Sequence, residues 1–111
     1  MARPNFIELP ASDIETAKAF YTRAFGWDLT GFGPTYACTM TGDVDIGLQG
    51  DAAEATQAPL PVIAVDDLEA ALAAVTAAGA QIVRPIFSFP GGRRFQFRDP
   101  HGNELAVMQA D

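Results

Sequence analysis

Two stretches decide the fold of this chain: SDIE at residues 12–15 and, 54 residues later, DDLE at 66–69. Each combines a side chain that can cap a helix with a glutamate three positions further on, a pattern typical of a helix N-terminus. We expect Ser12 and Asp66 to be the capping residues. The repeat indicates that the chain consists of two modules with one local plan.

Apolar residues recur at helical spacing after each of these stretches, which predicts two amphipathic helices. Gly26 and Gly79 follow, and we expect them to end the helices in the left-handed conformation. The spacing predicts buried positions at Ile14, Ala17, Tyr21, Ala24 and Phe25 in the first helix, and at Leu68, Ala71, Leu72, Val75 and Ala78 in the second.

Short alternating runs surround both helices and predict β-strands. One run precedes each helix and three follow it, so the order βαβββ occurs twice. The expected strands are 5–9, 27–32, 36–40, 44–48, 60–65, 81–87, 94–98 and 104–108. We therefore expect an α+β fold in which 1–111 form one domain, with module one at 1–50, a small polar linker at 51–59 and module two at 60–111.

The composition is that of a globular protein and excludes several classes of partner. The chain has 111 residues, of which 49% are hydrophobic and 19% charged, and its net charge is −7. Such an acidic chain has no electrostatic route onto nucleic acid or an anionic membrane surface. A single cysteine excludes an internal disulfide. We find no signal peptide or membrane-spanning run, so we expect a cytoplasmic protein.

Four motifs occur in a fixed order along the duplicated plan: ELPASD at 8–13, FY at 20–21, FGW at 25–27 and DPHGN at 99–103. In this order they resemble the vicinal oxygen chelate superfamily. That group holds glyoxalase I, the extradiol dioxygenases, fosfomycin-resistance enzymes and bleomycin-resistance proteins. The resemblance, over 6–109, implies two four-stranded sheets curled around a cleft, with a helix on the outer face of each. It also implies a homodimer, since relatives pair their modules between chains.

Enzymes of this superfamily hold a divalent metal with His, Glu or Gln side chains from the first and last strands of each module. Carried over by spacing from the acid at the start of each helix and from the Asp-Pro-x-Gly turn, three of these positions fall at Phe6, Leu60 and Ala106. The fourth, placed sixty residues before Ala106, falls at Ile46. Carbon cannot replace an oxygen or nitrogen ligand. The resemblance therefore implies that the usual metal site is lost, and we expect no cofactor.

Strand alternation assigns the remaining polar residues to faces of the sheets. Glu8 shares a face with Phe6, and Glu104 shares one with Ala106, while Leu105 and Val107 face the helix. The two glutamates could bind a cationic ligand, act as a base, form a displaced metal site, or simply be solvated or paired with arginine. The predicted cleft-lining set, with no catalytic residue assigned, is Phe6, Glu8, Tyr36, Ile46, Leu60, Arg94, Glu104, Ala106 and Met108.

Two members of this set have a second interpretation. Tyr36 could stack on a planar ligand, as in bleomycin-binding relatives, or belong to the core. Arg94 lies in a cluster with Arg93 and Arg98 that could anchor an anionic group, although a solvated strand face is the more common role of such a cluster.

Three functions are compatible with these features. We favour a metal-free small-molecule-binding protein of the bleomycin-resistance type. The first alternative is a glyoxalase-like lyase, isomerase or dioxygenase that uses a divalent metal in a relocated site around Glu8 and Glu104. The second is a non-catalytic interaction subunit whose cleft is filled by side chains. The expected partners are a small-molecule ligand and a second copy of the chain, with no nucleic acid and no membrane.

Overall fold

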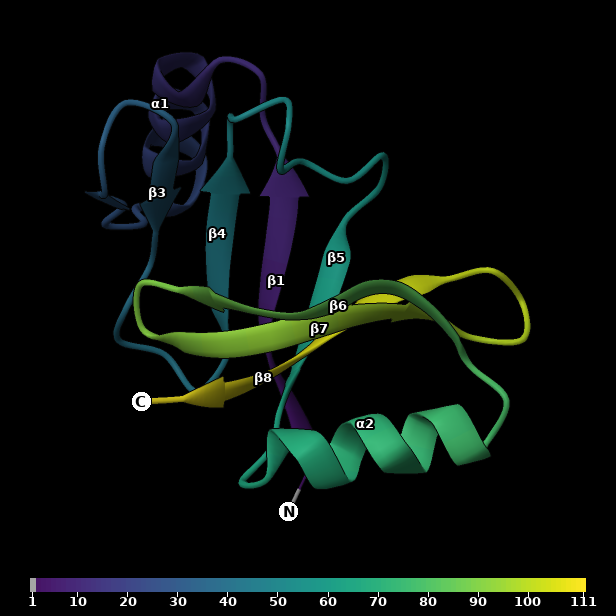
Figure 1. Cartoon of the computed structure of the whole chain (residues 1–111). Helices are drawn as coiled ribbons and strands as arrows, with labels where there is room; N and C mark the ends of the chain where they lie inside the picture. Colours follow the sequence, from purple (N-terminus) through teal and green to yellow (C-terminus); the bar gives the residue numbers. More distant parts are fainter. Residues whose placement is uncertain (1) are drawn as a thin grey trace. The chain divides into compact units, whose positions relative to one another are not determined.

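The computed structural model describes residues 2–111, which form two compact units (Figure 1). One comprises 6–60 and is called module one; the other comprises 61–111 with the residues up to Asn5 and is called module two. The elements of the first half are β1 (Arg3–Pro10), α1 (Ile14–Phe25), β2 (Thr30–Gly31), β3 (Tyr36–Cys38) and β4 (Asp45–Gln49). Those of the second half are β5 (Leu60–Ala64), α2 (Leu68–Ala77), β6 (Gln81–Phe89), β7 (Gly92–Arg98) and β8 (Glu104–Ala110).

The two modules have the same sheet topology. The strand order is β2-β3-β4-β1 in module one and β6-β7-β8-β5 in module two. In each, the first strand pairs in parallel with the last, and the other neighbours are antiparallel. The predicted α+β fold with two βαβββ modules is confirmed.

The helices begin one residue later than the sequence predicts. The side chain of Asp13 accepts a hydrogen bond from the Thr16 amide at 3.1 Å, and that of Asp67 accepts one from the Ala70 amide at 3.0 Å. Ser12 is therefore not the cap, and neither is its counterpart Asp66 in the second module. The stretches SDIE and DDLE each contain two adjacent side chains that can cap a helix, and in each the second one caps.

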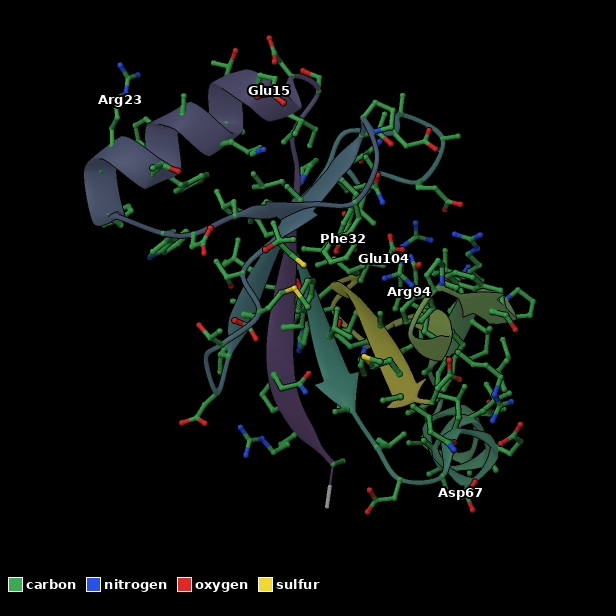
Figure 2. All side chains as sticks on the ribbon, turned by 90° about the vertical axis from the view of Figure 1, so that its left-hand side faces the viewer. Glu15, Arg23, Phe32, Asp67, Arg94 and Glu104 are labelled. Carbon is green, nitrogen blue, oxygen red and sulfur yellow. The ribbon has the colours of Figure 1, made fainter. Side chains whose placement is uncertain are left out.

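The helix ends follow the sequence more closely. Gly26 closes α1 with a φ of 70°, and Gly79, shortly beyond the end of α2, has a φ of 98°. Both are left-handed, as predicted. Figure 2 shows Glu15 near the start of α1 and Arg23 near its end, where each charge opposes the partial charge of the helix terminus.

Each helix packs on one face of its own sheet. In module one the buried cluster is Ile14, Leu29, Ala37 and Leu48, and in module two it is Leu68, Phe95, Phe97 and Val107. The prediction that Phe25 is buried is wrong, because its side chain is 64% exposed. Its ring stacks on Trp27 with centroids 5.3 Å apart, and Trp27 in turn stacks on Tyr21 at 5.1 Å. Ala24 and Ala78 are also exposed, contrary to prediction.

This aromatic stack shortens the second strand. Trp27 lies against Tyr21, and its carbonyl accepts a hydrogen bond from the Thr22 hydroxyl at 3.2 Å. The segment before residue 30 is therefore held beside α1 and does not join the sheet, so only Thr30–Gly31 form β2. Among the described residues, neither helix has the length and apolar character needed to cross a membrane.

Candidate functional site

The sheet of module one presents two faces of different chemistry. Strand register aligns Glu8 of β1 with Gly47 of β4, and Gly47 with Cys38 of β3. Aligned residues lie on the same face, and α1 covers the other face over Leu9 and Leu48. We call the face opposite α1 the distal face of module one; its residues include Phe6, Glu8, Tyr36, Cys38, Asp45 and Gly47.

Ile46 does not belong to this face. It pairs with Ile7 and packs against the core beneath α1, on the side of the sheet opposite Phe6. The prediction that Ile46 lines the cleft and occupies a metal-ligand position is therefore wrong. A shift of one residue along a strand moves a side chain to the other face.

The register identifies the correct counterpart. Val62 of β5 pairs with Ala106 of β8, and the equivalent pair in module one is Glu8 with Gly47. The counterpart of Ala106 is thus Gly47, which lies 59 residues earlier rather than 60. The same offset makes Asp45 the counterpart of Glu104. The corrected position still carries no metal-binding side chain.

The space above Gly47 is filled by two aromatic side chains. A Cβ atom at this residue would overlap the Tyr36 hydroxyl and would lie 2.6 Å from the tip of the Phe6 ring. Real Cβ contacts are essentially never this short, so only glycine fits without a shift of its neighbours. Phe6 and Tyr36 therefore occupy the region into which a ligand side chain at position 47 would project.

Glu8 is the buried carboxylate of this face. It is 4% exposed, and its Oε2 accepts a hydrogen bond from the Tyr36 hydroxyl at 3.0 Å. A buried carboxylate requires such partners, because its charge loses the solvation of water. The contact assigns Tyr36 a structural role as a hydrogen-bond donor to Glu8. Nearby, Asp45 Oδ1 accepts from the Thr39 hydroxyl at 2.8 Å and from the Gly42 amide at 3.1 Å, which stabilises the turn before β4.

Cys38 completes the row across this sheet. Burial raises the pKa of its thiol above the usual value, and the Asp45 carboxylate raises it further. A raised pKa lowers the thiolate fraction at neutral pH. The thiol therefore lacks the electrostatic environment of a catalytic nucleophile.

Module two has a corresponding distal face, opposite α2. The register aligns Arg94 with Met108, Gln96 with Ala106 and Arg98 with Glu104. Leu105 and Val107 belong to the core on the α2 side, as predicted. Leu60 is two residues before Val62 on β5 and thus shares its face; both it and Ala106 are buried. On β6 the same face carries Arg84, which pairs with Gln96, and Phe87, which pairs with Arg94.

A buried amide lies at the centre of this face. Gln96 is 4% exposed, and its Nε2 donates a 2.6 Å hydrogen bond to Glu104 Oε2. Only the nitrogen of an amide can donate to a carboxylate, so this contact determines which way the amide points. Its Oε1 is buried and has no hydrogen-bond partner among residues 2–111. Gln96 is thus held by Glu104, with its acceptor oxygen buried.

Two arginines stack on one aromatic ring beside this amide. The guanidinium carbon of Arg84 lies 3.5 Å from the centroid of the Phe87 ring, and that of Arg94 lies 5.2 Å from it. Arg94 is also 5.5 Å from the centroid of Phe89 and is 8% exposed. Figure 2 labels Arg94 and Glu104, which come from the neighbouring strands β7 and β8. Cation–π contact orients both guanidinium groups.

The adjacent Arg93 has the opposite orientation. It lies on the α2 side of β7 and forms a two-bond ion pair with Glu69 of α2, one bond measuring 3.1 Å. The hydrogen bond from Arg93 lowers the pKa of Glu69. Arg93 and Arg94, which the sequence groups in one cluster, therefore lie on opposite faces of the sheet.

The donor groups do not fit a divalent metal of the kind that the superfamily holds. At the four positions that the resemblance assigns to metal ligands, with the fourth corrected by the strand register, the chain has Phe6, Gly47, Leu60 and Ala106, and none of these carries an oxygen or nitrogen side-chain atom. Within residues 2–111, no group of three or more His, Cys, Asp or Glu side chains is arranged to hold a metal ion.

One hollow occurs elsewhere on module one. It measures about 480 Å³ and lies at the start of α1, where Pro10, Asp13, Phe20, Tyr21 and neighbouring residues line it. None of the nine predicted site residues contributes to it. It is on the helix side of the sheet and is separate from the distal face.

The sequence matches a known family over most of its length. Residues 3–107 match the family described as the Glyoxalase/Bleomycin resistance protein/Dioxygenase superfamily. Together with the two βαβββ modules, this match shows that the chain belongs to that superfamily.

Two relatives illustrate the range of similarity. The chain is 31% identical over 119 residues to "Putative glyoxylase CFP32" of Mycobacterium bovis, an alignment that covers 97% of this chain and 46% of the relative. It thus spans about half the length of that protein. A "Glyoxylase-like domain-containing protein" of Didymella fabae is 34% identical, with 91% of this chain and 88% of the relative covered.

Solved structures share the fold at low sequence identity. A methylmalonyl-CoA epimerase from Mycobacterium tuberculosis superposes with a TM-score of 0.79 at 14% identity and covers 97% of this chain and 87% of the epimerase. The Mn(II)-bound glyoxalase of Novosphingobium aromaticivorans superposes with a TM-score of 0.71 at 21% identity, over 98% of this chain and 40% of the glyoxalase. These similarities establish the architecture.

The structure sorts the predicted site residues into two groups and adds others. Phe6, Glu8 and Tyr36 lie together on the distal face of module one, whereas Ile46 lies behind it. Arg94, Glu104, Ala106 and Met108 lie on the distal face of module two. Leu60, the last residue of module one, is the first residue of β5, on the same side of that strand as Val62. Sequence reasoning missed Gly47, Arg84, Phe87 and Gln96. The alternation Arg94-Phe95-Gln96 was a usable signal for Gln96, because it assigns Gln96 to the face of Arg94.

Proposed function

We propose that this chain is a metal-free small-molecule-binding protein of the glyoxalase/bleomycin-resistance superfamily. One observation carries the proposal: the corrected set of ligand positions has only carbon or hydrogen in place of donor atoms, and the Phe6 ring and Tyr36 hydroxyl fill the space over Gly47. A binding role is supported by the polar groups of the two distal faces. Glu8 and Gln96 are buried there, although neither is needed for the cores beneath the helices.

The enzyme alternative requires a relocated metal site around Glu8 and Glu104. Against it, each carboxylate already accepts a hydrogen bond from its own sheet, Glu8 from Tyr36 and Glu104 from Gln96. Two carboxylates also form a poor ligand set for a transition metal. The metal-free interpretation is therefore favoured over the relocated site.

Elemental analysis of the purified full-length chain tests this proposal. We expect no stoichiometric Zn, Ni, Mn or Fe, and no stabilisation when these ions are added in thermal unfolding. Glu8→Gln and Glu104→Gln keep the shape of each side chain and remove its charge. About one metal per chain in the wild type, lost in either variant, would overturn the proposal and support the enzyme alternative.

A screen of small molecules by thermal shift tests the binding role. A specific hit supports it, while the absence of any hit in a metal-free protein would favour the interaction-subunit alternative. Glu104→Ala is expected to weaken binding of a hit because it releases Gln96. Val107→Ala, one strand position away from Ala106 but on the α2 side, is expected to lower the melting temperature and leave affinity unchanged.

A further inference from the structure

Helix α1 carries an aromatic side chain that the packing of module one leaves largely in solvent. Phe20 is 54% exposed and lies outside the cluster that packs beneath α1. Its one ring contact among the described residues is edge-to-face with Tyr21, and the two centroids lie 5.1 Å apart. Phe20 therefore presents most of its ring to whatever approaches this side of the helix.

An apolar hollow lies directly beside this ring. It measures about 480 Å³ and lies at the start of α1, with Phe20 among the residues that line it. Leu9, Ala17 and Leu48 also line it, and all three belong to the apolar packing between α1 and its sheet. A ring that entered from outside would remove apolar surface from water on both sides. Module one thus carries an exposed aromatic ring and a hollow that suits such a ring on the same surface.

Neighbouring complementary features of this kind fit a pair of copies with two-fold symmetry. In such an interface both copies offer the same patch, so the ring of each meets the hollow of the other. Thr16, Ala17 and Phe20 line the hollow from one stripe of α1, since residues three and four apart are neighbours on a helix surface. A two-fold axis perpendicular to this stripe makes the two α1 helices antiparallel.

The charges of α1 favour the antiparallel arrangement over the parallel one. Figure 2 shows Glu15 near the start of α1 and Arg23 near its end, and Asp13 precedes the helix as its cap. The Thr16 amide lowers the pKa of Asp13 by donating a hydrogen bond, so this carboxylate is charged at neutral pH. Within the part of the chain that the structure describes, Arg23 makes no ion pair. Antiparallel helices bring Arg23 of each copy toward the two acids of the other, whereas parallel helices bring like charges together.

We propose that two copies of this chain dimerise through antiparallel α1 helices, with Phe20 of each copy in the hollow of the other. In this pair Arg23 of each copy lies beside Asp13 and Glu15 of the other. The surface is on the helix side of the sheet, opposite the distal face of module one. The inference therefore does not rest on the proposed function. It also differs from the pairing of modules between chains that the family resemblance implies.

Sedimentation equilibrium of the full-length protein at constant ionic strength tests this contact. We expect a monomer–dimer equilibrium in which Phe20→Ser raises the dissociation constant by about 10-fold or more, because symmetry removes two buried rings at once. Circular dichroism checks that the variant is folded, which the exposure of Phe20 leads us to expect. A Phe20→Ser dimer as tight as the wild type would overturn the proposal, because another surface would then hold the two copies together.

Phe25→Ser is the matched control on the same helix. Phe25 is 64% exposed but does not line the hollow. Its five-residue separation from Phe20 places it about 140° around the helix axis. The dissociation constant of this variant should stay within about 2-fold of the wild-type value. An equal loss of affinity in both variants would refute the assignment of the hollow.

Two charge reversals test the orientation of the helices. Arg23→Glu and Lys18→Glu each make the net charge of −7 more negative by two units, so general repulsion between acidic copies rises equally in both. Lys18 is directed elsewhere, because its Nζ lies 3.9 Å from where a Cβ of Gly31 in β2 would be. We expect Arg23→Glu to raise the dissociation constant about 2- to 30-fold more than Lys18→Glu, the range for two exposed ion pairs. Equal effects would refute the antiparallel pairing.

The wild-type chain decides between a second copy and other occupants of the hollow. A chain that stays monomeric up to millimolar concentrations would overturn the proposal and leave the hollow to a small molecule or a different protein. Metal content and ligand binding at the distal faces are measured separately. The proposed function can therefore fail while this contact stands, and this contact can fail while the proposed function stands.

Discussion

Gly47 offers a direct test of how the distal face of module one is packed. In Gly47→Ala the new Cβ would overlap the Tyr36 hydroxyl and would lie 2.6–2.7 Å from atoms of the Phe6 ring. Both groups are at the ends of side chains and can move, but Tyr36 is held by its hydrogen bond to Glu8. Overpacking of this kind costs about 1–3 kcal/mol. At about 4 °C per kcal/mol for a chain of this size, the melting temperature should fall by about 4–12 °C.

Gly31→Ala is the matched control, because Gly31 is also a strand glycine of module one and a Cβ there meets only the Lys18 Nζ at 3.9 Å among the described residues. It should change stability by less than about 0.5 kcal/mol. A double-mutant cycle with Tyr36→Phe isolates the clash, since the double variant loses the hydroxyl that the new Cβ would meet. We expect it to be less destabilised than the sum of the single variants. If Gly47→Ala unfolds at the wild-type temperature, or if the cycle shows strict additivity, the packing over Gly47 is not as described.

Two further predictions concern stability and assembly. Hydrogen bonds from the Asn103 side chain and amide, with one from the His101 amide, lower the pKa of Asp99. The stabilisation from the ionised Asp99 is therefore complete above the pKa of an aspartate in the unfolded chain, near 3.9. It is lost as the pH falls through the lower pKa of the folded state. Asp99→Asn should consequently unfold at a lower temperature than wild type at pH 7, with the difference shrinking below pH 4; a constant difference across this range would contradict it. We also predict a homodimer, because module one exposes several large apolar side chains, among them Phe20 at 54% and Phe25 at 64%. Light scattering that gives a monomer mass at micromolar concentrations would refute this prediction.

The fold was predictable because two independent signals agreed. The repeated capping stretches marked both helix starts, and strand alternation supplied four strands around each helix. Errors arose where neighbouring residues offered the same chemistry. Ser12 and Asp13 can both cap a helix, and the choice depends on which backbone turn the packed helix adopts. The exposure of Phe25 was likewise invisible, because a ring that stacks on Trp27 has the same spacing as one that is buried.

The candidate site was predictable only in part, and the reason is strand register. Sequence spacing locates Ile46 by counting sixty residues back from Ala106. The chain from the first to the last strand is five residues shorter in module one (Glu8 to Gly47) than in module two (Val62 to Ala106), and no local pattern fixes this difference to the residue. Only the pairing of Glu8 with Gly47 resolves it. The conclusion about donor atoms survives the correction because both neighbouring candidates, isoleucine and glycine, lack them.

The side chain at the fourth position decides what this part of module one can do. An isoleucine at the fourth position would simply have been an apolar substitute in a cleft, compatible with any hydrophobic ligand. A glycine covered by Phe6 and Tyr36 means instead that module one has used the region for packing and for the hydrogen bond to a buried Glu8. Module two differs. Ala106, the counterpart of Gly47, pairs with Gln96, and Gln96 also pairs with Arg84 on the next strand. The Oε1 atom of Gln96 is buried and accepts no hydrogen bond from residues 2–111. The two halves of the duplicated fold have therefore diverged chemically, and recognition of a ligand is expected to depend on module two more than on module one.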